Sequence, residues 1–120
     1  MSHHPIVHVE FSANDRRQSA SFYENVFGWK MEHFDQMNYT TFNSGEGSVG
    51  GGLNPTSDES PAGTVMVYIH ADDLAATLEK VKANGGTVLL ENYEIPTVGW
   101  MAVSMDPSGN KISLMKPMPA

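Results

Sequence analysis

The segment Ile6–Gly28 reads IVHVEFSANDRRQSASFYENVFG and decides the fold. Its first six residues alternate in character along the chain, which is the period of a half-buried strand. The polar residues that follow predict a helix start, with Asn14 as the expected cap and Asp15 favouring the positive helix end. Gly28 predicts the end of this helix, because glycine readily adopts a left-handed conformation. The residues expected on the buried face of the helix are Ala20, Tyr23 and Phe27.

Shorter strands are expected around Lys30–Phe34, Tyr39–Phe42 and Val49–Leu53, separated by polar and glycine-rich turns. The last of these strands contains three consecutive glycines, Gly50-Gly51-Gly52, without the lysine and the helix that a phosphate loop requires. These glycines indicate a bulged, thin strand that lets another group approach closely. Residues 54–63 hold two prolines, two serines and two acids. Without an apolar pattern, they read as an exposed linker.

The strand–helix pattern then recurs. Setting Val7–Phe11 over Val65–Ile69 needs an offset of 58 residues, and the same offset takes Asp15 to Asp73 and Gly28 to Gly86. A second helix is expected to begin after Ala71-Asp72-Asp73 and to end at Gly85-Gly86. Its apolar stripe consists of Leu74, Leu78 and Val81.

Three further strands are expected at Thr87–Asn92, Gly99–Met105 and Lys111–Met115. Near the carboxyl end the offset between the copies grows to 62, which places Gly51 over Ser113. The repeat predicts a single α+β domain over residues 1–120, built of two tandem βαβββ modules. The first module covers about residues 5–53 and the second about residues 64–116.

The composition excludes several classes of protein. The chain of 120 residues has 14 acidic and 7 basic side chains and a formal charge of −7. This balance counts against nucleic-acid partners and against an anionic membrane surface. The absence of cysteine excludes disulfides, thiolate metal sites and a cysteine nucleophile. Neither a secretory signal nor an apolar stretch of membrane-spanning length is visible, so we expect a cytoplasmic protein.

Two motifs carry a family resemblance. The run Phe22–Trp29, FYENVFGW, and the turn Asp106–Asn110, DPSGN, resemble the vicinal oxygen chelate superfamily. This is the group of glyoxalase I, bleomycin resistance proteins and extradiol dioxygenases, and the likeness runs from about Ile6 to Met115. It implies that the two modules form a curved mixed sheet, an open cup lined by inner-face side chains, with the helices outside. It also implies a homodimer, which would cover exposed edge strands.

In metal-using members of this superfamily, the resemblance implies four inner-face ligands, one from the first and one from the last strand of each module. The positions carried over to this chain are His8, Gly51, Met66 and Ser113. Only His8 is a competent ligand for a divalent ion, because glycine offers no donor and a thioether prefers soft Cu(I). We therefore expect the inherited metal site to be lost and no cofactor to be required.

Other arrangements of polar residues stay open. Residues two apart on a strand share a face, so His8 and Glu10 lie together, as do Tyr68 and His70. His8, Glu10 and His70 could form a two-histidine, one-carboxylate set for a divalent metal. Alternatively, His8 and Glu10 could act without metal as catalytic acid and base, because burial raises a carboxyl pKa and histidine titrates near neutrality. The residues predicted to bind a ligand are Tyr68, His70, Trp100, Met66 and Ser113.

Aromatic side chains are further candidates for the cavity wall or the core. Trp29 directly follows the helix stop, which favours a place in the core. Trp100 follows Pro96 and Gly99 on what reads as a mobile loop, which favours contact with a ligand. Tyr39 and Met101 could also contribute to the wall.

Two functions from different classes are consistent with these residues. The first is a metal-free protein of the glyoxalase and bleomycin-resistance type that binds a small organic molecule. The second is a lyase, isomerase or dioxygenase that uses a non-inherited metal or a His/Glu acid–base pair. Separately, His3 or His4 near a free amine could chelate Cu(II) or Ni(II) adventitiously.

Overall fold

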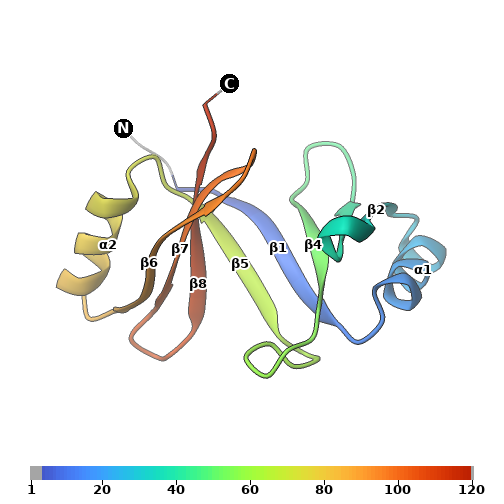
Figure 1. Ribbon diagram of the computed structural model, residues 1–120, viewed down its shortest axis with the longest axis horizontal. Helices are drawn as coiled ribbons and strands as arrows, with labels where there is room; N and C mark the ends of the chain where they lie inside the picture. The colour runs from blue at the N-terminus through green and yellow to red at the C-terminus, as the bar shows by residue number, and fades with distance from the viewer. Residues whose placement is uncertain (1–3, 120) are drawn as a thin grey trace. The chain divides into compact units, whose positions relative to one another are not determined.

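Two compact units make up the part of the chain that the structure describes, residues 4–119. In this computed structural model, the first unit comprises His8–Met66 and the second comprises residues 4–7 and 67–119. Each unit contains four strands and one α-helix (Figure 1). The predicted α+β fold of two βαβββ modules is therefore confirmed.

The first unit is built on a mixed four-stranded sheet. Its strands are β1 (Ile6–Ala13), β2 (Lys30–Phe34), β3 (Tyr39–Asn43) and β4 (Gly50–Pro55). Helix α1 (Arg16–Phe27) follows β1, and a 3-10 turn, η1 (Asp35–Met37), joins β2 to β3. The strand order is β2-β3-β4-β1, in which β1 and β4 are parallel and the other neighbours antiparallel.

The second unit repeats this topology. Strand β5 (Val65–His70) leads into helix α2 (Leu74–Ala83), and β6 (Thr87–Ile95), β7 (Gly99–Met105) and β8 (Lys111–Pro117) follow. The strand order is β5-β8-β7-β6, again with the first and last strands of the module parallel. Strand β6 is three residues longer than expected, and two register shifts interrupt its pairing with β7.

The helix caps preserve the repeat. Asp15 is the N-cap of α1, where its carboxylate accepts from the Gln18 backbone N–H at 3.1 Å. Asp73, 58 residues later, caps α2 by accepting from Ala76 N–H at 3.0 Å. The prediction of Asn14 as a cap is wrong, because Asp15 is the residue that reaches the free N–H groups of the first turn.

The two helices end differently. Gly28 has a left-handed backbone, with φ of 72°, and confirms the predicted end of α1. In α2 the C-cap is Asn84, and the left-handed glycine is Gly85, with φ of 87°, rather than Gly86. The match of Gly28 to Gly86 is therefore wrong by one residue.

Each helix packs on one face of its own sheet. In the first unit, Ala20 of α1 meets Leu53 of β4 in a core that Phe11 and Tyr23 border. The prediction that Phe27 is buried is wrong, because its side chain is 58% exposed. In the second unit, α2 contributes Leu74 and Leu78 to the hydrophobic core, as expected. The sheet residues that complete this second core are Ala71, Ala102 and Leu114.

The strand register corrects the alignment of the two modules. Glu10 lies opposite Gly52 in the first unit, and Tyr68 lies opposite Ser113 in the second. Because Glu10 and Tyr68 correspond at the offset of 58, Gly52 corresponds to Ser113, at an offset of 61 rather than 62. The earlier assignment of Gly51 to the inner face is thus wrong, and Gly52 occupies that position.

Candidate functional site

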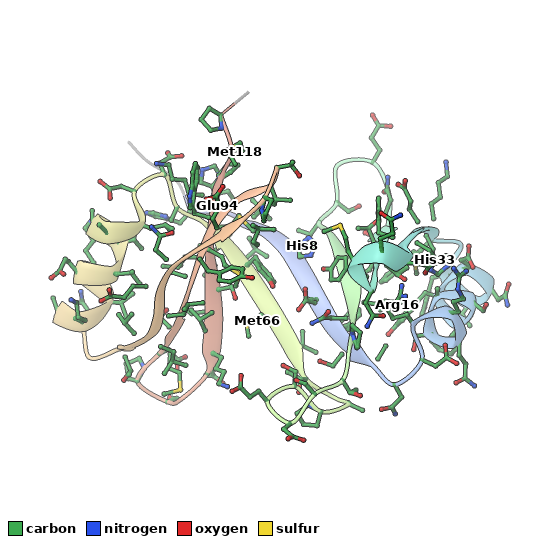
Figure 2. All side chains as sticks on the ribbon, in the orientation of Figure 1. His8, Arg16, His33, Met66, Glu94 and Met118 are labelled. Carbon is green, nitrogen blue, oxygen red and sulfur yellow. The ribbon has the colours of Figure 1, made fainter. Side chains whose placement is uncertain are left out.

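A chain of hydrogen bonds joins three side chains on the face of the first sheet that points away from α1. The Tyr39 hydroxyl on β3 donates to Glu10 Oε2 on β1 at 2.8 Å. The same hydroxyl lies 2.8 Å from Nε2 of His8, also on β1. We refer to these residues as the His8–Tyr39–Glu10 cluster; Figure 2 labels His8 on its strand. His8 and Glu10 therefore lie together, as predicted, and Tyr39 connects them.

The glycine at position 52 of β4 makes this cluster possible, because it has no side chain. Strand β4 lies between β3 and β1, so Tyr39 must extend across it to reach the other two residues. A Cβ atom built at Gly52 would lie 2.2 Å from Tyr39 Cζ, far inside contact distance. On the opposite face, a Cβ at Gly51 would clash with the Phe42 ring. The glycines thus admit close approach as predicted, but the pairing of β4 runs without a register shift, so the expected bulge is absent there.

The direction of the hydrogen bonds defines the protonation of the cluster. An ionised carboxylate only accepts, so the single Tyr39 hydroxyl proton points to Glu10. The His8 Nε2 must then donate to the Tyr39 oxygen, and Nδ1 carries the lone pair of the neutral ring. Burial lowers the pKa of His8 below 6.5, which keeps the ring neutral at pH 7. The cluster therefore combines a neutral imidazole with a carboxylate through one phenol.

A second polar group lies on the α1 side of the first unit, and sequence reasoning did not identify it. The hydroxyl of Thr40, which is fully buried, accepts from Arg16 Nη1 at 2.7 Å and lies 2.8 Å from Nδ1 of His33. Figure 2 labels Arg16 and His33 on this side. Arg16 also pairs with Asp35 at 3.2 Å, and this ion pair, with that of Arg17, lowers the Asp35 pKa. These contacts tie α1 to β3 and η1, which is a structural role.

The second unit places most of the predicted ligand-binding residues on the sheet face away from α2. Tyr68 and His70 alternate along β5, and Ser113 of β8 lies opposite Tyr68. Met66, two residues before Tyr68 on β5, is the last residue of the first unit. Tyr68 is buried, and Ser113 Oγ is fully buried with no hydrogen-bond partner among residues 4–119. The His70 ring lies 2.7 Å from an Asp72 carboxylate oxygen.

Trp100 occupies a different place from the one expected. It belongs to β7, not to a mobile loop, and it packs against the core under α2. It is therefore on the opposite face of the second sheet from Tyr68 and Ser113. Trp29, predicted to be a core residue, is half-buried beside the core, with its ring 4.7 Å from that of Phe42 and 5.0 Å from that of Tyr23.

The corrected register gives His8, Gly52, Met66 and Ser113 at the four positions that correspond to the superfamily's metal ligands. A divalent metal centre needs about three protein donors of the imidazole or carboxylate type. Of these four residues only His8 supplies one, so this donor set does not fit such an ion. Throughout residues 4–119, no group of three or more histidines and acidic residues is gathered as a metal site requires. His3, invoked for an adventitious chelate, lies outside the described residues, and His4 Nδ1 is 2.9 Å from the His70 carbonyl oxygen.

The family follows from these features and from comparison with known proteins. The sequence pattern of the glyoxalase/bleomycin resistance protein/dioxygenase superfamily matches residues 5–114. The chain belongs to this superfamily. It is 33% identical over 93 residues to a glyoxylase-like domain-containing protein of Didymella fabae, covering 72% of this chain and 73% of that protein.

A second relative is longer. CFP32 of Mycobacterium bovis, whose name describes it as a candidate glyoxylase, is 39% identical over 102 residues. The match covers 82% of this chain but 39% of the relative, so this chain spans about two fifths of the length of CFP32.

Solved structures share the fold at low sequence identity. A hypothetical protein from Bacillus halodurans superimposes with a TM-score of 0.75 at 16% identity, covering 99% of this chain and 98% of the other. Methylmalonyl-CoA epimerase from Mycobacterium tuberculosis gives a TM-score of 0.71 at 16% identity, with 95% and 88% covered. No helix within residues 4–119 is long and apolar enough to span a membrane.

Proposed function

We propose that this chain is a small-molecule-binding member of the superfamily in which the His8–Tyr39–Glu10 cluster, rather than an inherited metal, receives the ligand. The hydrogen-bonded chain across Gly52 carries this proposal. It gathers an imidazole, a phenol and a carboxylate on one sheet face, and such convergent polar groups fix the orientation of small ligands. The poor donor set at the inherited metal positions supports the same reading.

The chemistry of the cluster favours a ligand with both hydrogen-bond donors and acceptors. Glu10 accepts only, whereas the neutral His8 ring both donates and accepts. A hydroxy acid, a hydroxyketone or a sugar-like molecule would satisfy both kinds of group. A purely apolar ligand would leave the carboxylate desolvated, which costs free energy. We therefore propose a small, polar, oxygen-rich organic molecule.

A second candidate is an enzyme that moves a proton next to a carbonyl group, and the neutral state of His8 favours it. A neutral imidazole can take a proton from carbon while the electron pair moves into the adjacent C–O bond as an enolate. Return of the proton to carbon would complete an isomerisation or epimerisation without any net redox change. Methylmalonyl-CoA epimerase shares the fold, which supports no more than the suitability of the scaffold for such a step.

The first experiment measures bound metal and ligand on protein starting at Pro5, which removes the adventitious His3 and His4 chelate. Mass spectrometry should find less than stoichiometric Fe, Mn, Ni and Zn in protein purified without chelators. In a thermal-shift screen, at least one small polar metabolite should then raise the melting temperature of the protein. Stoichiometric metal would contradict the proposal.

Matched variants connect the ligand to the cluster. Tyr39→Phe and Glu10→Gln should abolish the ligand-induced thermal shift, whereas Glu32→Gln, an exposed acid on neighbouring β2, should retain it. Deuterium exchange at carbon, followed by NMR, tests the second candidate. If wild-type protein binds the ligand but exchanges no deuterium, binding alone is its function. Exchange that His8→Gln abolishes supports the enzyme.

We also propose a homodimer. Within residues 4–119, strands β2 and β6 each have a hydrogen-bonded neighbouring strand on one side only, and β6 carries exposed Leu89 and Tyr93. Exposed strand edges of this kind need cover. Light scattering should give twice the mass of one chain, and a monomeric mass at micromolar concentration would contradict the proposal.

A further inference from the structure

The second unit contains a cavity that is separate from the His8–Tyr39–Glu10 cluster. Its volume is about 380 Å³, within the range typical of small-molecule sites. It lies between the first turn of α2 and the ends of the sheet strands that carry Trp100 and Lys116. The lining residues that matter for the argument are Asp72, Asp73, Leu74, Asn92, Trp100 and Lys116. Every one of them belongs to the second unit.

An aromatic surface forms one wall of this cavity. The Trp100 indole packs against the α2 core and still lines the open space. Lys116, its direct neighbour across β7 and β8, places Nζ over the face of the indole ring, 5.4 Å from the ring centre, in a cation–π contact. Leu74 supplies apolar surface from the first turn of α2. A flat aromatic ligand group can take the place of this ammonium group over the indole, which leaves the Lys116 ammonium group to pair with a negative charge on the same ligand.

Opposite charges line the same space without forming an ion pair with each other. Within residues 4–119, Lys116 makes no salt bridge within 4.0 Å, and the partner of Asp72 is His70. The hydrogen bond from His70 is the main cause that lowers the Asp72 pKa, with a smaller contribution from the charge of Lys116. Asp72 is consequently ionised at neutral pH. The Asp73 carboxylate is engaged by the Ala76 backbone N–H.

We propose that this cavity binds a small aromatic zwitterion, such as an aromatic α-amino acid, with its ring on Trp100, its carboxylate at Lys116 and its ammonium group at Asp72. A simple anion would meet the repulsion of Asp72 and Asp73. A simple cation would meet the repulsion of Lys116. Only a ligand that carries both charges is attracted to both Lys116 and Asp72. The Asn92 amide can hydrogen-bond to either the carboxylate or the ammonium group of such a ligand.

NMR spectroscopy of the indole N–H groups tests the proposal with three matched probes: L-phenylalanine, phenethylamine and 3-phenylpropanoate. The chain has two tryptophans, so Trp29 in the other unit serves as an internal reference. Phenylalanine should shift the Trp100 signal saturably while the Trp29 signal stays in place. Phenethylamine and 3-phenylpropanoate should each bind about fivefold more weakly than phenylalanine. Each lacks one of the two charges, and a partly exposed ion pair contributes about this factor to affinity.

Variants separate the two charged contacts. Lys116→Gln should weaken phenylalanine binding about fivefold, whereas Lys111→Gln on the same strand should not. Asp72→Asn should have the same effect, with Asp58→Asn as its control. A wild-type melting temperature and circular dichroism spectrum confirm that each variant is folded. The proposal is overturned if phenylalanine leaves the Trp100 signal unmoved, or if 3-phenylpropanoate binds as tightly as phenylalanine.

Discussion

Tyr39 crosses strand β4 directly above Gly52, and a Cβ atom at that glycine would lie 2.0 Å from the Tyr39 hydroxyl oxygen. The phenol reaches Glu10 and His8 only because this position carries no side chain. One glycine thus determines whether three residues from two strands can form a hydrogen-bonded cluster.

Gly52→Ala should lower the free energy of unfolding by about 1–3 kcal/mol, because the methyl group forces the Tyr39 ring out of place. Chemical denaturation measures this loss. Gly50→Ala is the matched control, since its Cβ would meet only the Phe42 carbonyl oxygen at 3.2 Å. In a Tyr39→Ala background the cost of Gly52→Ala should nearly vanish. An equal cost in both backgrounds would show that the clash with Tyr39 is not the cause.

The stability of the protein should depend on pH through His8. Its folded-state pKa lies below the unfolded value of 6.5, so the unfolded chain takes up the proton first. The contribution of neutral His8 to the free energy of unfolding is complete above pH 6.5. It is lost as the pH falls through 6.5 toward the folded-state pKa. Denaturation at several pH values should show a smaller loss below pH 6.5 in His8→Gln than in wild type. Parallel curves for the two proteins would contradict this assignment.

Removing either helix cap should destabilise the protein by about 1 kcal/mol. Asp15→Ala leaves the backbone N–H groups of Arg17 and Gln18 without their acceptor, and Asp73→Ala does the same to Ala76. Asn14→Ala should change stability by less than about 0.5 kcal/mol, since Asn14 caps neither helix. Thermal or chemical denaturation of the three variants shows whether α1 is capped by Asp15, as in the structure, or by Asn14, as the sequence suggested.

Replacing Thr97 should stabilise the turn between β6 and β7. Thr97 has φ of 65°, a left-handed conformation that β-branched residues rarely adopt. The turn is closed by a bond from Val98 N–H to the Ile95 carbonyl oxygen at 3.0 Å. Thr97→Asn should raise the free energy of unfolding by about 0.5–1 kcal/mol, because asparagine tolerates this conformation. A lower melting temperature in Thr97→Asn than in wild type would rule out strain at this position.

Much of the fold could be predicted because its signals are local. The alternation in β1, the cap residue Asp73 and the stop at Gly28 each depend on a few neighbouring side chains. The predictions that failed depended on other parts of the chain. Phe27 is the last residue of α1, and its 58% exposure depends on tertiary packing that helical spacing does not specify. The one-residue error at Gly51 arose because a parallel register is fixed by pairing and not by sequence similarity.

The candidate site was predictable only in part. His8 and Glu10 share a face because of strand alternation, which the sequence shows directly. Tyr39 was expected to be a wall residue, and its role in joining the other two requires the strand order β3-β4-β1 and a glycine at the crossing point. The run Gly50-Gly51-Gly52 was the available signal, although nothing in it specified which aromatic residue would approach. The residues predicted for the second unit, including Tyr68 and Ser113, stay predictions.

The contact between Gly52 and Tyr39 also constrains how this chain can evolve. Any side chain at position 52 is penalised for as long as the phenol lies above it. A carboxylate or imidazole suited to binding metal could therefore become established there only after Tyr39 had been replaced by a smaller residue. The replacement of Tyr39 must therefore precede the substitution at Gly52. The variant that carries only the first change has lost the hydrogen-bonded connection between His8 and Glu10 and has gained no metal ligand. At the corresponding Ser113, a side chain is already accommodated, so the second copy of the repeat is the more permissive starting point for new chemistry.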